Sequence, residues 1–116
     1  MKYISTIATT AFLALVGCGP TFREVSVKDV SKSETIVLKK NPSQGSVSSI
    51  QITGIGSVVG NAEVQLILNG SVYKTESVSG SVKFEWSGDW YSDDAEVRYI
   101  PGTATSGALT LRYQFR

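Results

Sequence analysis

Apolar and polar side chains alternate one by one along several segments of this chain. The clearest rows lie at residues 62–68, 81–87 and 109–116. Because successive side chains of a strand point to opposite faces, a period of two predicts strands with one buried and one solvated face. Helical periodicity does not recur, so helices are expected to be absent or a single turn. Weaker rows of the same kind lie at residues 25–30, 35–38, 48–53, 72–78 and 96–100.

Turn-forming dipeptides separate these rows. Asn69-Gly70 lies between two of them and predicts a two-residue hairpin, because a type I′ turn needs positive φ at both positions and Asn and Gly tolerate it. Ser79-Gly80 predicts the next reversal, Pro101-Gly102 and Ser106-Gly107 bracket a later loop, and Asn41-Pro42 interrupts the chain earlier. Seven or eight short strands at this spacing predict an all-β fold, an antiparallel β-sandwich or small barrel over residues 25–116.

The glycine-rich stretch 54–60 lacks the spacing of a dinucleotide-binding loop and precedes no predicted helix. We interpret its glycines as turn or bulge positions. Its apolar residues Ile55, Val58 and Val59, if exposed at a loop tip, would form a contact surface for a partner or a membrane.

The N-terminal segment has the pattern of an export signal. Lys2 supplies one positive charge, and the apolar run 4–16 has thirteen residues, too few to span a bilayer. The residues Leu15-Val16-Gly17-Cys18 that end it resemble the lipobox of bacterial lipoprotein precursors. That resemblance implies cleavage before Cys18, attachment of fatty chains to its sulfur, and a short tether over residues 18–24. Gly19 follows the cysteine where Asp would favour inner-membrane retention, so we expect lipid anchoring in the bacterial cell envelope, at the outer membrane.

Composition excludes several functions. Removing the first 17 of 116 residues leaves 99, with ten of the eleven basic side chains against ten acidic ones. This balance offers no long-range attraction for nucleic acid. The chain has no histidine, and lipidation would consume its only cysteine, so the commonest general base is missing and no disulfide can form. No serine–lysine or paired-carboxylate arrangement stands out, and we expect no enzyme activity.

The loop 87–94 is the richest cluster of polar and aromatic residues. Trp90 and Tyr91, with the carboxylates of Asp89, Asp93 and Asp94, could form a sugar-binding platform. The same carboxylates are oxygen ligands of the kind that calcium prefers, which makes calcium the one cofactor left open. In the alternative structural interpretation, one aromatic ring folds back over the end of the sandwich and the aspartates lie in turns.

Charged residues on the polar side of their rows could form a cross-strand ladder if their strands are neighbours. These residues are Lys83, Glu85, Glu96, Arg98 and Arg112.

Taken together, these features predict a lipid-anchored envelope protein whose β-domain binds a partner, an envelope protein, without catalysis. A carbohydrate-binding module is the first alternative, and a small envelope hydrolase or inhibitor is the second. Small periplasmic lysozyme inhibitors share the size and the lipobox, but their usual disulfide cannot form here.

Overall fold

The structure is a computed structural model that describes residues 22–116, so the predicted signal and Cys18 lie outside the described residues. Within them the chain forms antiparallel strands and no helix, which confirms the predicted all-β class. The strands are β1 (Arg23–Ser26), β2 (Glu34–Lys39), β3 (Ser49–Leu68), β4 (Ser71–Asp89), β5 (Asp94–Pro101) and β6 (Ser106–Phe115). The described part contains no helix long and apolar enough to cross a membrane.

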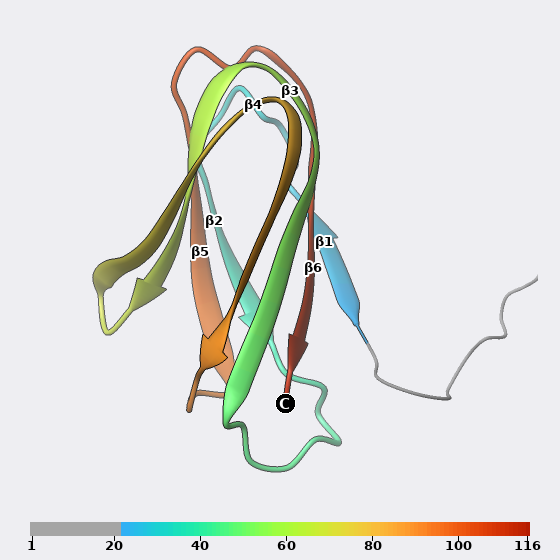
Figure 1. The fold of residues 1–116 in the computed structure, drawn as a ribbon, viewed down its shortest axis with the longest axis vertical. Helices are drawn as coiled ribbons and strands as arrows, with labels where there is room; N and C mark the ends of the chain where they lie inside the picture. Colours follow the sequence, from blue (N-terminus) through green and yellow to red (C-terminus); the bar gives the residue numbers. More distant parts are fainter. Residues whose placement is uncertain (1–21) are drawn as a thin grey trace, which may run out of the picture.

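The six strands curl into a half-barrel with two layers, and β3 and β4 belong to both layers (Figure 1). The first half of β3 pairs with β6, and its second half pairs with β5. Strand β4 follows β3 along both halves. Strand β1 extends the β6 layer, and β2 extends the β5 layer.

The predicted hairpin at Asn69-Gly70 is confirmed. Leu68 pairs with Ser71, and the two residues between them have φ values of 53° and 79°. Positive φ at both positions is the signature of a type I′ turn, which matches the twist of the flanking strands.

The predicted reversal at Ser79-Gly80 is wrong, whereas a bulge, one of the two interpretations of the glycines at 54–60, is present at Gly60. Val58 pairs with Gly80 and Asn61 pairs with Ser79, so Val59 and Gly60 are extra residues in a β-bulge. A bulge bends a strand without ending it. Residues 49–68 and 71–89 are therefore single long strands, each covering two predicted ones, and residues 22–116 form six strands.

The core lies between the two layers and contains no buried charged side chain among residues 22–116. The inner face of β6 supplies Leu109, Leu111, Tyr113 and Phe115, as its alternation predicts. Tyr99 of β5 is the largest fully buried side chain, and its hydroxyl donates a hydrogen bond to the Val30 carbonyl at 2.7 Å. A buried phenol requires such a partner, because an unpaired hydroxyl in the core costs free energy.

Candidate functional site

Trp90 covers one end of the sandwich and is only 4% exposed. Its indole N–H donates to the Asp94 carbonyl at 2.9 Å, and its ring lies 6.5 Å from that of Tyr73. Tyr91, in contrast, is 77% exposed. The predicted two-ring platform is therefore not formed. One ring folds back over the open end, and Tyr91 alone faces solvent.

The three aspartates of this loop do not converge. Asp93 forms an ion pair with Lys40 at 3.3 Å, and Asp94 is contacted by Ser92. Asp89 ends β4, where it pairs with Ser49. No group of three carboxylates that could hold a metal ion occurs in the range 22–116. The three aspartates therefore do not form a set of calcium ligands in this structure.

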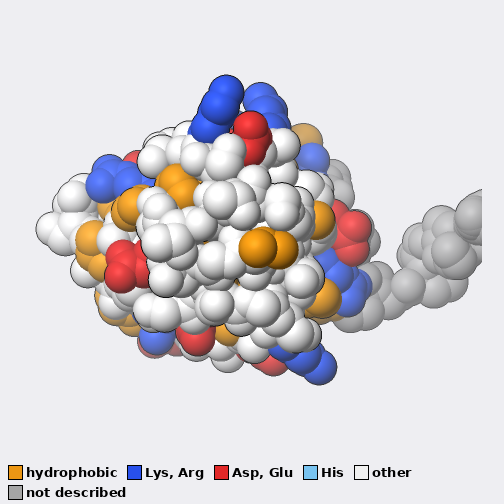
Figure 2. All heavy atoms as spheres, turned by 90° about the horizontal axis from the view of Figure 1, so that it is seen from above, with side chains coloured by type: hydrophobic (Ala, Val, Ile, Leu, Met, Phe, Trp, Pro, Cys, Tyr) orange, Lys and Arg blue, Asp and Glu red, His pale blue; other side chains and the backbone are white. Residues whose placement is uncertain are grey.

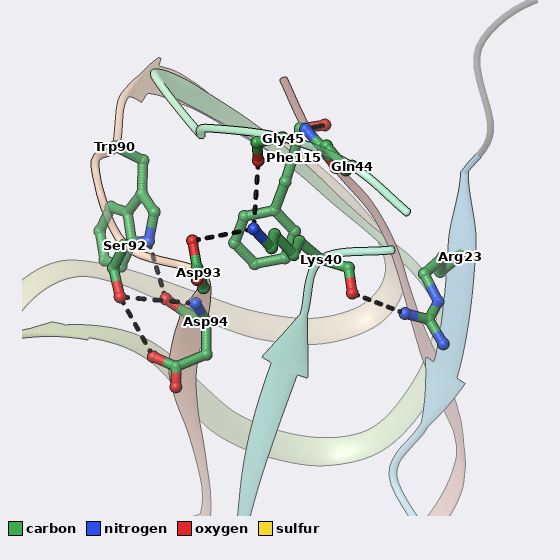
Figure 3. A network of polar contacts seen from close by, with 9 residues as sticks. All are labelled: Arg23, Lys40, Gln44, Gly45, Trp90, Ser92, Asp93, Asp94 and Phe115. Atoms are coloured by element: carbon green, nitrogen blue, oxygen red, sulfur yellow. Dashed lines mark hydrogen bonds and ion pairs between the residues drawn. The ribbon is translucent and has the colours of Figure 1, made fainter. Parts of the chain in front are cut away.

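The loops at this end are tied to one another. We define the base as residues 40–48 and 90–93, Arg116 and the start of β1. Lys40 contacts the Gly45 carbonyl at 3.1 Å in addition to Asp93, and the Gln44 amide donates to the Phe115 carbonyl at 2.7 Å (Figure 3). These bonds join loops that come from distant parts of the sequence, so the base is held as one unit.

The opposite end has a different chemistry. We define the distal surface as residues 57–61, 79–81 and 102–108, which are the bends of β3 and β4 and the loop between β5 and β6. None of these residues is charged. Seen from above, this end is mostly uncharged, with Lys, Arg, Asp and Glu toward its rim (Figure 2). The exposed residues are small or polar except for Val59, which is 59% exposed.

Hydrogen bonds hold the distal surface in shape. Asn61 accepts bonds from the N–H groups of Gly102, Ala104 and Thr103, and the Thr103 hydroxyl accepts a bond from the Asn61 N–H at 3.0 Å. Gly60 has a φ of 95°, and a Cβ there would clash with the Thr103 carbonyl. Only glycine fits this close approach of two backbones. The surface is therefore preorganised.

A shallow depression of about 450 Å³ adjoins the distal surface. Glu63 is the only charged residue that lines it. The lining also includes Ile100, which is 38% exposed, so the depression offers both apolar contact and carboxylate or amide oxygens. Its lining residues are Asn61, Ala62, Glu63, Ser77, Ile100, Pro101 and Gly102.

The stretch 54–60 contributes to this surface in a different way from the one predicted. Ile55 and Val59 are exposed, but Val58 is 1% exposed and belongs to the core. These residues lie on a strand and its bulge, where alternation continues, and not at a loop tip. The contribution of residues 79–81 and 102–108 was not predicted, although their lack of charge is visible in the sequence.

The predicted charge ladder is not formed, because β3 lies between β4 and β6 and β5 belongs to the other layer. Ion pairs form elsewhere, between Arg112 and Glu24 at 3.3 Å and between Arg98 and Glu96 of the same strand.

Two titratable groups have shifted pKa values, Asp29 in the turn between β1 and β2 and Tyr99, which contacts that turn. The Ser31 hydroxyl and N–H donate to Asp29 at 2.6 and 2.9 Å and lower the pKa of that carboxyl. Burial, and to a lesser degree the charge of Asp29, raises the pKa of Tyr99. Both groups stabilise this turn through their hydrogen bonds. Tyr99 also lines a shallow depression of about 180 Å³, together with Ser33, Glu34, Thr35, Arg98 and Ile100.

No protein-family model and no curated protein matches this chain. Among solved structures, the crystal structure of PirA is similar at 11% identity with a TM-score of 0.50, covering 82% of this chain and 93% of that chain. A de novo designed double-stranded beta-helix is 10% identical over 83% of this chain and 99% of that one, with a TM-score of 0.43. The carbohydrate-binding module CBM36, in complex with calcium and xylotriose, is 13% identical over 84% and 90%, with a TM-score of 0.40. At 11% identity, the similarity to PirA concerns the fold alone. The TM-scores of the other two structures are too low to support an inference.

Proposed function

We propose that this protein is a lipid-anchored binding module of the bacterial cell envelope, most simply at the outer membrane, that holds an envelope protein and catalyses no reaction. The observation that carries the proposal is the distal surface. It is uncharged, preorganised by hydrogen bonds and contains the exposed Val59 as its one large exposed apolar side chain.

A surface of this kind suits protein contact. Desolvating small polar and apolar groups costs less than desolvating charges, and the cores of protein interfaces are depleted in charged residues. Because the backbone is already fixed by the Asn61 bonds, little conformational entropy remains to be lost on binding. The adjoining depression gives the partner one concave feature to fill.

The anchor rests on the sequence motif at Cys18. Two or more fatty chains on one residue give stable membrane attachment, whereas a single chain holds a protein only marginally. The proposal thus combines a lipidated N-terminus with a contact surface at the far end of the domain.

Site-specific photocrosslinking in the native envelope tests this function. A photoreactive residue at position 59 should yield a discrete crosslinked species, identified by mass spectrometry, and the same residue at the equally accessible position 37 should not. Val37, at 51% exposed on β2, lies outside the distal surface and is the matched control. Crosslinks at neither position, or at both alike, would argue against a distal binding surface.

The carbohydrate alternative now depends on Tyr91 without Trp90. Binding of an oligosaccharide panel that is lost in Tyr91→Ala and kept in Val59→Asp would favour this alternative over the proposed one.

A further inference from the structure

We infer that the base of the domain lies against the lipid surface, with Tyr91 at the level of the headgroups, so that the long axis stands away from the membrane. This inference rests on the proposed lipidation of Cys18.

The first argument is the length of chain between the lipid and the fold. Only residues 19–22 separate Cys18 from Arg23, where β1 begins. An extended chain advances at most about 3.6 Å per residue, so the five steps from Cys18 to Arg23 span roughly 18 Å at most. The domain is 49 Å along its longest axis. The tether is therefore too short for the distal surface to face the bilayer when the long axis of the domain is perpendicular to the membrane.

The second argument is where the tether joins the fold. Arg23 pairs with Tyr113, close to the end of β6. The Arg23 guanidinium donates to the carbonyls of Lys39 and Lys40 at 3.2 and 3.1 Å, and through Lys40 it is connected to Asp93 (Figure 3). The entry point of the chain is thus fixed to the loops of the base. The lipid anchor therefore restrains the position of the base directly.

The third argument is the chemistry of the base. The base contains the basic residues Arg23, Lys40 and Arg116 and the acidic residues Glu24 and Asp93. The residues next to it in the sequence add Lys39 on one side and Asp89 and Asp94 on the other, so the charges are nearly balanced. This balance neither repels nor strongly attracts anionic headgroups. Tyr91 projects from it at 77% exposure, and tyrosine is a residue type that settles at the membrane–water interface because its ring is apolar and its hydroxyl polar. The base therefore fits a lipid surface of any net charge, held there by the tether.

Fluorescence quenching in vesicles tests this orientation. Because the lipid occupies the sulfur of Cys18, an introduced cysteine is the only free thiol of the lipidated protein. Ser46→Cys in the base and Ser81→Cys in the distal surface replace two exposed serines whose hydroxyls form no hydrogen bond within residues 22–116. Each labelled protein is reconstituted into phosphatidylcholine vesicles that contain a headgroup-labelled quenching lipid.

We expect quenching at position 46 to be at least threefold stronger than at position 81. Equal quenching would mean that the domain lies on its side or tumbles, and stronger quenching at position 81 would mean that it is inverted. Either result overturns the inference while leaving the anchor intact. Failure of the lipidated protein to float with vesicles overturns the anchor itself, and the inference with it.

A longer tether provides the second test. Insertion of about ten Gly and Ser residues after Gly19 gives a flexible linker whose root-mean-square length is about 17 Å on its own. If the short tether sets the orientation, quenching at position 46 falls at least twofold in this variant. Unchanged quenching would show that the tether does not set it.

Discussion

At the scale of single residues, Trp90 and Tyr91 show how neighbours in the chain can have opposite roles. The Trp90 ring is enclosed by the core, and its N–H is satisfied by the Asp94 carbonyl. The Tyr91 ring contacts solvent over most of its surface. The first side chain therefore stabilises the fold, and the second is free to contact a membrane or a ligand.

This difference is measurable in the free energy of unfolding. Trp90→Ala should lower it by about 3–5 kcal/mol, because a large aromatic side chain is removed from a buried site. Tyr91→Ala should change it by less than about 0.5 kcal/mol. Urea unfolding followed by the fluorescence of Trp86, which both variants retain, measures both values. Comparable losses in the two variants would contradict the assignment.

Tyr99 joins β5 to the turn that follows β1, through its bond to the Val30 carbonyl. Tyr99→Phe removes this bond and should lower the free energy of unfolding by about 1 kcal/mol at pH 8. The exposed Tyr91→Phe is the control and should have no effect.

The same residue gives a pH dependence with a definite sign. Burial raises the pKa of Tyr99 in the folded protein, whereas the unfolded phenol ionises near pH 10. The unfolded state thus loses its proton first as the pH rises, so the contribution of Tyr99 is complete below about pH 10 and is lost between the unfolded and the folded pKa. Urea unfolding from pH 8 to pH 11 should show the wild type and Tyr99→Phe converging. A constant difference would contradict this.

At the scale of elements, the bend of β3 decides the architecture. Val59 and Gly60 are the extra residues of the bulge, and the backbone of Gly60 closely approaches Thr103. Without this bend the second half of β3 could not leave the β6 layer to pair with β5. One bulge therefore produces the two-layered half-barrel.

Gly60→Ala should be destabilising, because its φ of 95° is unfavourable for a residue with a Cβ and because that Cβ would clash with the Thr103 carbonyl. We expect a loss of about 1–3 kcal/mol in urea unfolding. Gly45→Ala is the control, since no atom lies within 4 Å of a Cβ at that position. A variant at position 60 as stable as the one at position 45 would show that the bend does not depend on this close approach.

The bend also explains which parts of the fold were readable from the sequence. Alternation and the Asn69-Gly70 turn are local signals, and the predicted hairpin is present. The predicted strands are present too, except that residues 27–30 lie beyond the end of β1 and that two pairs of predicted strands form the long strands β3 and β4. The dipeptide Ser79-Gly80 carries the same local signal as a turn, but its partner across the strands is the bulge at residues 59 and 60. Whether a glycine ends a strand or bends it depends on that distant pairing. For the same reason the distal surface, assembled from three separate segments, was predicted only in its 54–60 part.

At the scale of the whole molecule, the two ends of the long axis have different surfaces. The base contains charges of both signs and the entry point of the chain, whereas the distal surface is uncharged and exposes Val59 as its one large apolar side chain. In the proposed arrangement the lipid holds the first end at the membrane, and the second is presented to a partner about one domain length away.

Removal of the thiol tests that arrangement in the native envelope. Cys18→Ala leaves no sulfur for the fatty chains, so the protein should move from the membrane fraction to the soluble fraction or remain as an uncleaved precursor. Membrane fractionation together with the intact mass of the protein distinguishes these outcomes. Lys2→Gln is the control. It should change the membrane-bound fraction much less, because it alters the signal without removing the sulfur that accepts the lipid. A Cys18→Ala protein that is processed to the mature length and still cofractionates with the membrane would mean that something other than the proposed lipid holds the domain there.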